Sequence, residues 1–115
     1  MNWQEIAEKY PKAFDKWSGY LEKVFYADIH ALDYPLTLIV GYLFLFFDEA
    51  GIKLVIDNEE LGIEYDLKVK FSADILEIPK DWYHVGYYDT RQEAWILGFE
   101  KCFEILENQL KEVKE

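Results

Sequence analysis

The last quarter of the chain carries the pattern that most limits the fold. From Trp95 to Val113, apolar residues recur at steps of three and four, which places them on one side of a helix. Thr90, followed three residues later by Glu93, is the capping-box pattern, in which each side chain satisfies a backbone donor of the first turn. The sequence therefore predicts a helix over residues 91–111, and its apolar side must cover another layer.

The layer beneath this helix is predicted to be a sheet. Residues 62–71 alternate between apolar and charged side chains, which is typical of a strand with one buried face. A shorter strand is predicted at 52–57, with a hairpin connection at 58–62. A third strand is predicted at 74–78, ending at Pro79, and a candidate fourth at 82–88. Links this short do not allow parallel crossovers, so the sheet should be an antiparallel meander.

The first part of the chain is predicted to be helical. Residues 3–25 show helical periodicity, and Pro11 should kink this segment or divide it into two short helices near Tyr10. Residues 35–47 are nearly all apolar, but a membrane-spanning helix needs roughly 20 such residues. Asp48 and Glu49, followed by Gly51, are typical of a helix end, so this segment is predicted to be a buried helix.

Together these elements predict a single α+β domain over residues 1–115. It should contain two N-terminal helices, an antiparallel meander sheet of three or four strands, and a long C-terminal helix packed on the sheet. A chain of 115 residues, of which 51% are hydrophobic, is large and apolar enough to form one packed core.

The charge of the chain argues against several classes of partner. Net charge is -11, from 12 basic and 23 acidic residues, and Arg91 is the only arginine. Proteins that bind nucleic acids directly neutralise phosphates with lysine and arginine clusters, so no direct nucleic-acid contact is expected. Anionic membrane surfaces would repel the chain as well. Residues 35–89 carry net -7, which either keeps the protein soluble or forms a patch for a basic protein partner. The candidate acidic residues are Glu59, Glu60, Glu64 and Asp66.

No combination of residues predicts a catalytic, metal or cofactor site. The two histidines, His30 and His84, do not have zinc-site spacing to Cys102. Asp28, His30 and Asp33 come closest to a ligand cluster, but their loop-like setting favours a polar surface loop. Cys102 falls within the apolar stripe, where cysteine behaves as a small hydrophobic residue. A single cysteine and an N-terminus without a signal-peptide pattern favour a cytoplasmic location.

The segment at 82–88 is unusually aromatic and is the second candidate for an interaction surface. Its aromatic residues are Trp82, Tyr83, Tyr87 and Tyr88. Tyrosine and tryptophan anchor protein interfaces, but they also pack as cross-strand pairs within a sheet, so both interpretations stay open. Alternation along the strand predicts that one of two sets faces outward, either Trp82, His84 and Tyr88 or Tyr83, Val85 and Tyr87.

Four segments of the chain carry a family resemblance. They are Lys9–Phe14 (KYPKAF), Phe46–Ile52 (FFDEAGI), Tyr88–Ala94 (YDTRQEA) and Phe99–Glu107 (FEKCFEILE). Together they resemble a group of small uncharacterised proteins encoded in bacterial genomes, prophages and phages. The resemblance covers about half of the chain and implies a bacterial or phage origin. The resemblance implies no activity and therefore no functional residue, and helix ends and an apolar stripe account for the matching segments.

Three functional hypotheses follow from these patterns. The first is a non-enzymatic domain that binds a partner protein through its aromatic or acidic residues. The second is an acidic decoy of the phage type, which would mimic the charge of DNA or inhibit a basic host protein. The third is a small enzyme with an unrecognised site, which would need a cleft with convergent polar groups. The sequence is compatible with either a monomer or a homodimer.

Overall fold

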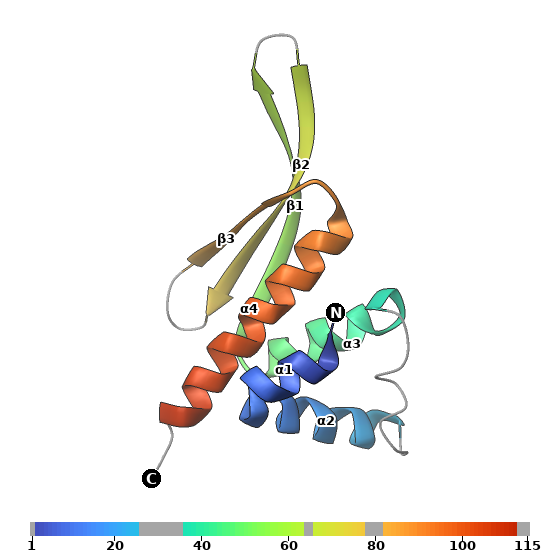
Figure 1. Ribbon diagram of the computed structural model, residues 1–115, viewed down its shortest axis with the longest axis vertical. Coiled ribbons are helices and arrows are strands. Elements are labelled where there is room, and N and C mark those ends of the chain that lie inside the picture. Colours follow the sequence, from blue (N-terminus) through green and yellow to red (C-terminus); the bar gives the residue numbers. More distant parts are fainter. Residues whose placement is uncertain (1, 26–35, 64–65, 78–81, 113–115) are drawn as a thin grey trace.

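The chain folds into an α+β structure with helices on one side of a three-stranded sheet (Figure 1). The computed structural model describes residues 2–25, 36–63, 66–77 and 82–112. The predicted fold class is confirmed: N-terminal helices precede an antiparallel meander, and a long C-terminal helix packs on the strands. The elements are α1 (Trp3–Lys9), α2 (Pro11–Phe25), α3 (Leu36–Glu49), β1 (Ile52–Ile63), β2 (Asp66–Glu77), β3 (Trp82–Tyr88) and α4 (Arg91–Glu112).

The break between α1 and α2 confirms the effect predicted for Pro11. The Tyr10 amide closes α1 by donating to the Ile6 carbonyl at 2.8 Å, while the Tyr10 backbone departs from helical geometry. Pro11 then occupies the first position of α2, where its missing N–H removes no helical hydrogen bond. The two helices therefore meet at an angle, and α1 folds back along α4 (Figure 1).

The ends of α3 and α4 also form as predicted. Gly51 has φ 79°, the left-handed conformation that closes a helix, and its amide lies 3.0 Å from the Asp48 carbonyl. At the start of α4, the Thr90 hydroxyl accepts from the Glu93 amide at 3.1 Å and donates to the Glu93 carboxylate at 3.2 Å. None of the helices in the described ranges is both long and apolar enough to cross a membrane.

The sheet has longer strands and fewer turns than the sequence suggests. The predicted hairpin connection at 58–62 lies inside β1, because pairing continues from Ile52 opposite Glu77 to Ile63 opposite Asp66. The segments predicted as separate strands at 62–71 and 74–78 are combined in the single strand β2. Cross-strand pairing with an apolar-rich partner outweighs the turn preference of Asn58 and Gly62. As a result, the β1–β2 hairpin projects well beyond the end of β3 (Figure 1).

The core lies between the sheet and the helices and is dominated by aromatic residues. Trp17, Phe47, Phe99 and Phe103 are fully buried. Their rings pack at angles typical of aromatic clusters, with the centroids of Phe47 and Phe103 5.0 Å apart and nearly perpendicular. The residues come from three helices, α2, α3 and α4, so this cluster fixes the helices relative to one another.

One buried carboxylate joins α4 to the start of α2. Glu107 is 2% exposed, and its Oε1 accepts a hydrogen bond from the Ala13 amide at 2.8 Å. Ala13 lies in the first turn of α2, where amides lack helical partners and the helix dipole favours a negative charge. Tyr10, which precedes this helix, has no side chain suited to capping. Glu107 therefore caps α2 from a distant part of the chain.

Candidate interaction surface

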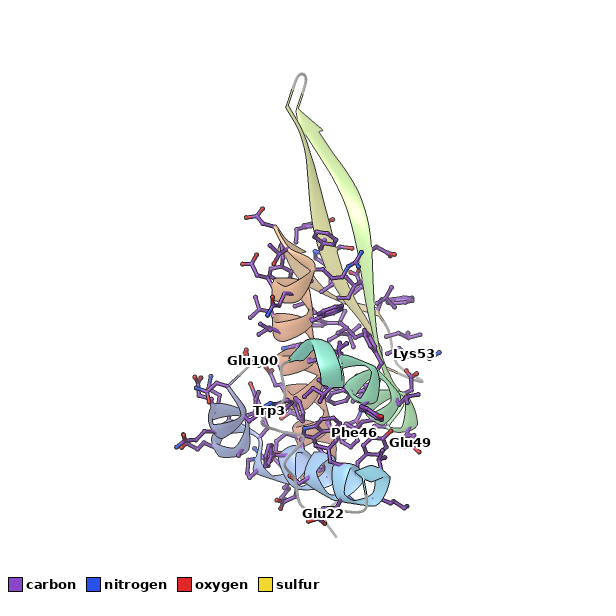
Figure 2. All side chains as sticks on the ribbon, turned by 90° about the vertical axis from the view of Figure 1, so that its right-hand side faces the viewer. Trp3, Glu22, Phe46, Glu49, Lys53 and Glu100 are labelled. Atoms are coloured by element: carbon purple, nitrogen blue, oxygen red, sulfur yellow. The ribbon has the colours of Figure 1, made fainter. Side chains whose placement is uncertain are left out.

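In the described part of the chain, helices cover one face of the sheet and leave the other uncovered. Leu54, Ala73 and Ile75 are buried on the face that packs against α4. The opposite side, here called the open face, has no helix over it in the described ranges. Figure 2 shows α4 along one side of the sheet and Lys53 pointing away from the other. The open face consists of Lys53, Val55 and Asp57 on β1, Asp74 and Leu76 on β2, and Trp82, His84 and Tyr87 on β3. Ser72 lies on the same side of β2 but is fully buried.

A β-bulge decides which aromatic residues of β3 reach the open face. Asp74 pairs with His84 but Ala73 pairs with Gly86, which leaves Val85 as an extra residue. The alternation therefore shifts by one residue within β3. Both predicted sets are therefore wrong, because they assume regular alternation along β3 and the bulge interrupts it. The set on the open face is Trp82, His84 and Tyr87, while Tyr83, Val85 and Tyr88 face α4.

The aromatic residues of the open face lie close together and are accessible to a partner. The Trp82 side chain is 57% exposed and that of Tyr87 is 47% exposed. The rings of His84 and Tyr87 are 4.8 Å apart, and His84 Nδ1 lies 2.7 Å from Asp74 Oδ1. Large amphipathic rings held in a fixed arrangement are the residues that most often anchor protein interfaces.

The strand that carries these rings lies at the edge of the sheet. The strand order is β1-β2-β3, so β3 has a sheet neighbour only on its β2 side within the described residues. Natural edge strands are usually protected by lysines, prolines or inward-pointing charges. The residues from Trp82 to Tyr88 include no lysine, proline or carboxylate, and the bulge at Val85 is their one protective feature.

A cleft lies on the other side of β3, between this strand and α4. Its volume is about 360 Å³, within the range of small-ligand sites. Three tyrosines and two carboxylates contribute to its walls, and Tyr83 is 48% exposed at its rim. The full lining is Tyr10, Tyr83, Val85, Tyr88, Leu97, Glu100, Lys101 and Glu104.

Two of the charged groups in this cleft, Lys101 and Glu104, form a close pair. The Lys101 ammonium donates to Glu104 Oε2 at 2.9 Å, and this hydrogen bond is the main reason that its pKa is raised above 10.5. Its Nζ also lies 4.7 Å from the centroid of the Tyr83 ring. Burial, followed by the negative charges of Glu104 and Glu100, raises the pKa of Tyr10, so this phenol stays protonated at neutral pH.

Sequence reasoning found part of this region and missed the rest. Tyr83 and Tyr88 belong to the predicted aromatic segment, and the structure brings them together with Tyr10, between α1 and α2, and with residues of α4. Glu100 and Glu104 look like ordinary acids on a helix surface, because their approach to Tyr10 depends on tertiary contacts. Their spacing of four, which places both on one side of α4, is the only signal that the sequence contains.

The predicted acidic candidates lie outside what the structure describes at side-chain level. Glu64 is not among the described residues, and Glu59, Glu60 and Asp66 are described only by their backbone positions in β1 and β2. Their backbones belong to the projecting hairpin rather than to the open face beside β3. The proposal of an acidic patch at these residues therefore stays a prediction.

The residues considered for chemistry do not form a reactive site in the described part of the chain. Cys102 is fully buried, and burial raises the pKa of its thiol far above the ordinary 9.0, which keeps the sulfur in its unreactive protonated form. No group of three or more histidine, cysteine or carboxylate side chains converges there as a metal site would require. Asp28, His30 and Asp33 lie outside the described residues.

A second cavity of about 280 Å³ lies at the other end of α4. Its walls are mostly apolar, with Lys16 and Glu49 as the charged contributors. It contains no combination of an acid, a base and a nucleophile, so its chemistry is that of an apolar depression. The residues that line it are Lys16, Tyr20, Phe46, Glu49, Ala50, Leu106 and Leu110.

Comparisons with protein-family models, with curated proteins and with solved structures find no match for this chain. The family resemblance of the sequence therefore stays an expectation, and any function must be argued from the surface itself.

Proposed function

We propose that this chain is a small acidic interaction domain that binds a protein partner through the open face and edge of its sheet. The observation that carries the proposal is the exposure of Trp82 and Tyr87 on the open face of an edge strand, which no helix of the described residues covers. Leaving large rings in water forgoes the free energy of burying them, so their clustering on one strand indicates a surface that is covered in a complex.

A basic protein is the partner class that fits the charge of the chain. The formal net charge is -11, and Asp57, Asp74 and Asp89 lie on or beside the open face and the edge. Lys53 is the one lysine among the residues of the open face. A negative surface around an aromatic centre accelerates encounter with a basic partner and suppresses encounter with acidic ones.

The proposal is tested by capturing partners with matched surface variants. The tagged protein, the Trp82→Ala/Tyr87→Ala variant and a Leu45→Ala control are compared at low and high salt. Leu45 is 55% exposed on α3, so the control removes an exposed apolar side chain from another surface. We expect the partner to be basic, and its affinity to fall about 30-fold in the double variant and to stay unchanged in the control.

The salt series separates this mode of binding from a purely electrostatic one. Contacts made by buried rings persist at high salt, whereas contacts between exposed charges weaken as the Debye length shortens. Retention of the same partner by the double variant would contradict the proposal. Complete loss of the partner from the unmodified protein at high salt would favour the acidic-decoy hypothesis instead.

A further inference from the structure

The cleft between β3 and α4 combines aromatic rings with carboxylates, which is the chemistry of a site for an organic cation. Tyr10, Tyr83 and Tyr88 contribute rings, and Glu100 and Glu104 contribute negative charge. The face of an aromatic ring attracts ammonium and guanidinium groups, and carboxylates add charge-assisted hydrogen bonds. The same carboxylates would repel a phosphate or an acidic side chain.

The protein already places one of its own cations in this cleft. Lys101 Nζ lies 4.7 Å from the Tyr83 ring centroid and 2.9 Å from Glu104 Oε2. These two contacts show that the geometry accepts an ammonium group between a ring and a carboxylate. Lysine has a flexible stem and a strongly hydrated head, so Lys101 can move into solvent when another cation takes its place.

The second carboxylate of the cleft is only weakly engaged. Glu100 Oε2 lies 3.8 Å from Lys9 Nζ, and the Lys9 side chain is half exposed. Exposed pairs at this distance contribute little, because water screens the attraction and two long side chains lose freedom. Glu100 is therefore available to a ligand that enters beside Tyr10.

We propose that the cleft binds a lysine or arginine side chain of the protein partner, and that Lys101 occupies this position in the free protein. The identity of the occupant rests on the proposed function. A partner that binds along the β3 edge would reach both sides of the strand, and so the cleft as well. Tyr83 links the two regions, because it lies on the edge strand and at the rim of the cleft. The cleft would then be the position at which a basic side chain of the partner is recognised.

The test is an NMR titration of the intact protein with Nα-acetyl-lysine N-methylamide, followed through the amide signals of α4 and β3. The uncharged Nα-acetyl-norleucine N-methylamide is the matched ligand, because it keeps most of the stem and lacks the ammonium. We expect the lysine compound to shift signals around Tyr83 and Glu104, and the norleucine compound to leave them in place.

Three variants sharpen this titration. Lys101→Met removes the competing ammonium, so affinity for the lysine compound should rise about two- to five-fold. Glu104→Gln should lower that affinity by a similar factor. Glu22→Gln makes the same charge change on α2, away from Glu100 (Figure 2), and should have no effect. The amide spectrum of each variant shows directly whether it is folded.

The outcomes distinguish this inference from the proposed function. Unchanged or weaker affinity in Lys101→Met, or equal shifts from both compounds, would overturn the cation site. If the titration contradicts the cation site while the Trp82→Ala/Tyr87→Ala variant still loses the partner, the proposed interaction domain is supported and the cation site is not. If the lysine compound binds as expected while that variant keeps its partner, the cleft stands and the open face is not the binding surface.

Discussion

The two faces of the sheet are built from the same strands and differ in what covers them. On β2, Ile75 is fully buried under α4, while the next residue, Leu76, lies half-buried on the open face. On β3, Tyr88 packs against the core and Tyr87 is 47% exposed. Neighbouring residues of similar chemistry thus have opposite roles. The position of α4, and not the composition of the strands, decides which side is core and which is surface.

The largest effect should appear in the chemical reactivity of Cys102, on the covered side. We expect a thiol reagent to modify the native protein at least about a thousandfold more slowly than the urea-unfolded chain, because reaction requires the core to open. The measurement is the rate of thiol modification with and without urea. Cys102 is the only cysteine, so the signal reports one site.

The raised pKa of the Cys102 thiol also makes the free energy of unfolding depend on pH. The folded protein holds the thiol proton more tightly than the unfolded chain does. The contribution of Cys102 to the free energy of unfolding is therefore fully present below pH 9.0. As the pH rises above 9.0, the free energy of unfolding should fall, and Cys102→Ala should lack this component. Rapid modification of the native protein would show that α4 is not closed over the sheet.

The next effect compares neighbouring residues of β2. Ile75→Ala should lower the free energy of unfolding by about 2 to 5 kcal/mol, because it leaves a cavity between the sheet and α4. Leu76→Ala removes a side chain of the same size from the open face, where water replaces it, and should cost about 1 kcal/mol or less. Urea unfolding followed by circular dichroism measures both. Equal losses would mean that the open face is packed in solution, for example by a second copy of the chain.

Much of the covered side was predictable from local sequence rules. Pro11, Gly51 and Thr90 each act through their own backbone or the next turn, so the helix ends that they define follow from short segments. The apolar stripe of α4 likewise follows from its spacing. These signals are local, and they predict the helices and their ends without knowledge of the tertiary contacts.

The open face and the cleft depend on contacts that local rules do not describe. The bulge at Val85 arises from how β3 aligns with β2, and it moves Tyr87 and Tyr88 to the faces opposite to those that simple alternation predicts. The turn predicted at 58–62 is wrong because these residues pair with β2, from Asn58 opposite Phe71 to Gly62 opposite Leu67. The approach of Glu104 to Tyr10 joins residues that are far apart in the chain.

A third prediction concerns the buried capping residue that holds α2 against α4. Glu107→Ala should lower the free energy of unfolding by about 1 to 3 kcal/mol, because the Ala13 amide loses its acceptor in a buried position. Glu107→Gln keeps a side-chain oxygen at the same place and should lose less. Chemical denaturation of the two variants gives the difference. If both variants lost the same amount, the negative charge rather than the hydrogen bond would be the stabilising feature.

A smaller effect tests how closely α4 approaches β1. A Cβ atom at Gly98 would lie 2.7 Å from Leu54 Cδ1, so Gly98→Ala should force Leu54 to move within the core. The cost of overpacking, reduced by the better helix propensity of alanine, should be about 1 kcal/mol. Gly41→Ala is the matched control, because Gly41 is an exposed residue within α3 with no atom within 4 Å of the new Cβ. The control should gain up to about 1 kcal/mol, and a similar gain at Gly98 would contradict the close contact.

The smallest effect belongs to the open face. Asp74→Asn weakens the contact between His84 Nδ1 and Asp74 Oδ1, which joins two side chains that are 47% and 31% exposed. Exposed pairs of this kind contribute about 0 to 1 kcal/mol, so the free energy of unfolding should hardly change. Partner binding should respond more strongly, because His84 would no longer be fixed beside Tyr87. A loss of stability as large as that of Ile75→Ala would show that the open face supports the fold, and the two faces of the sheet would then no longer differ in role.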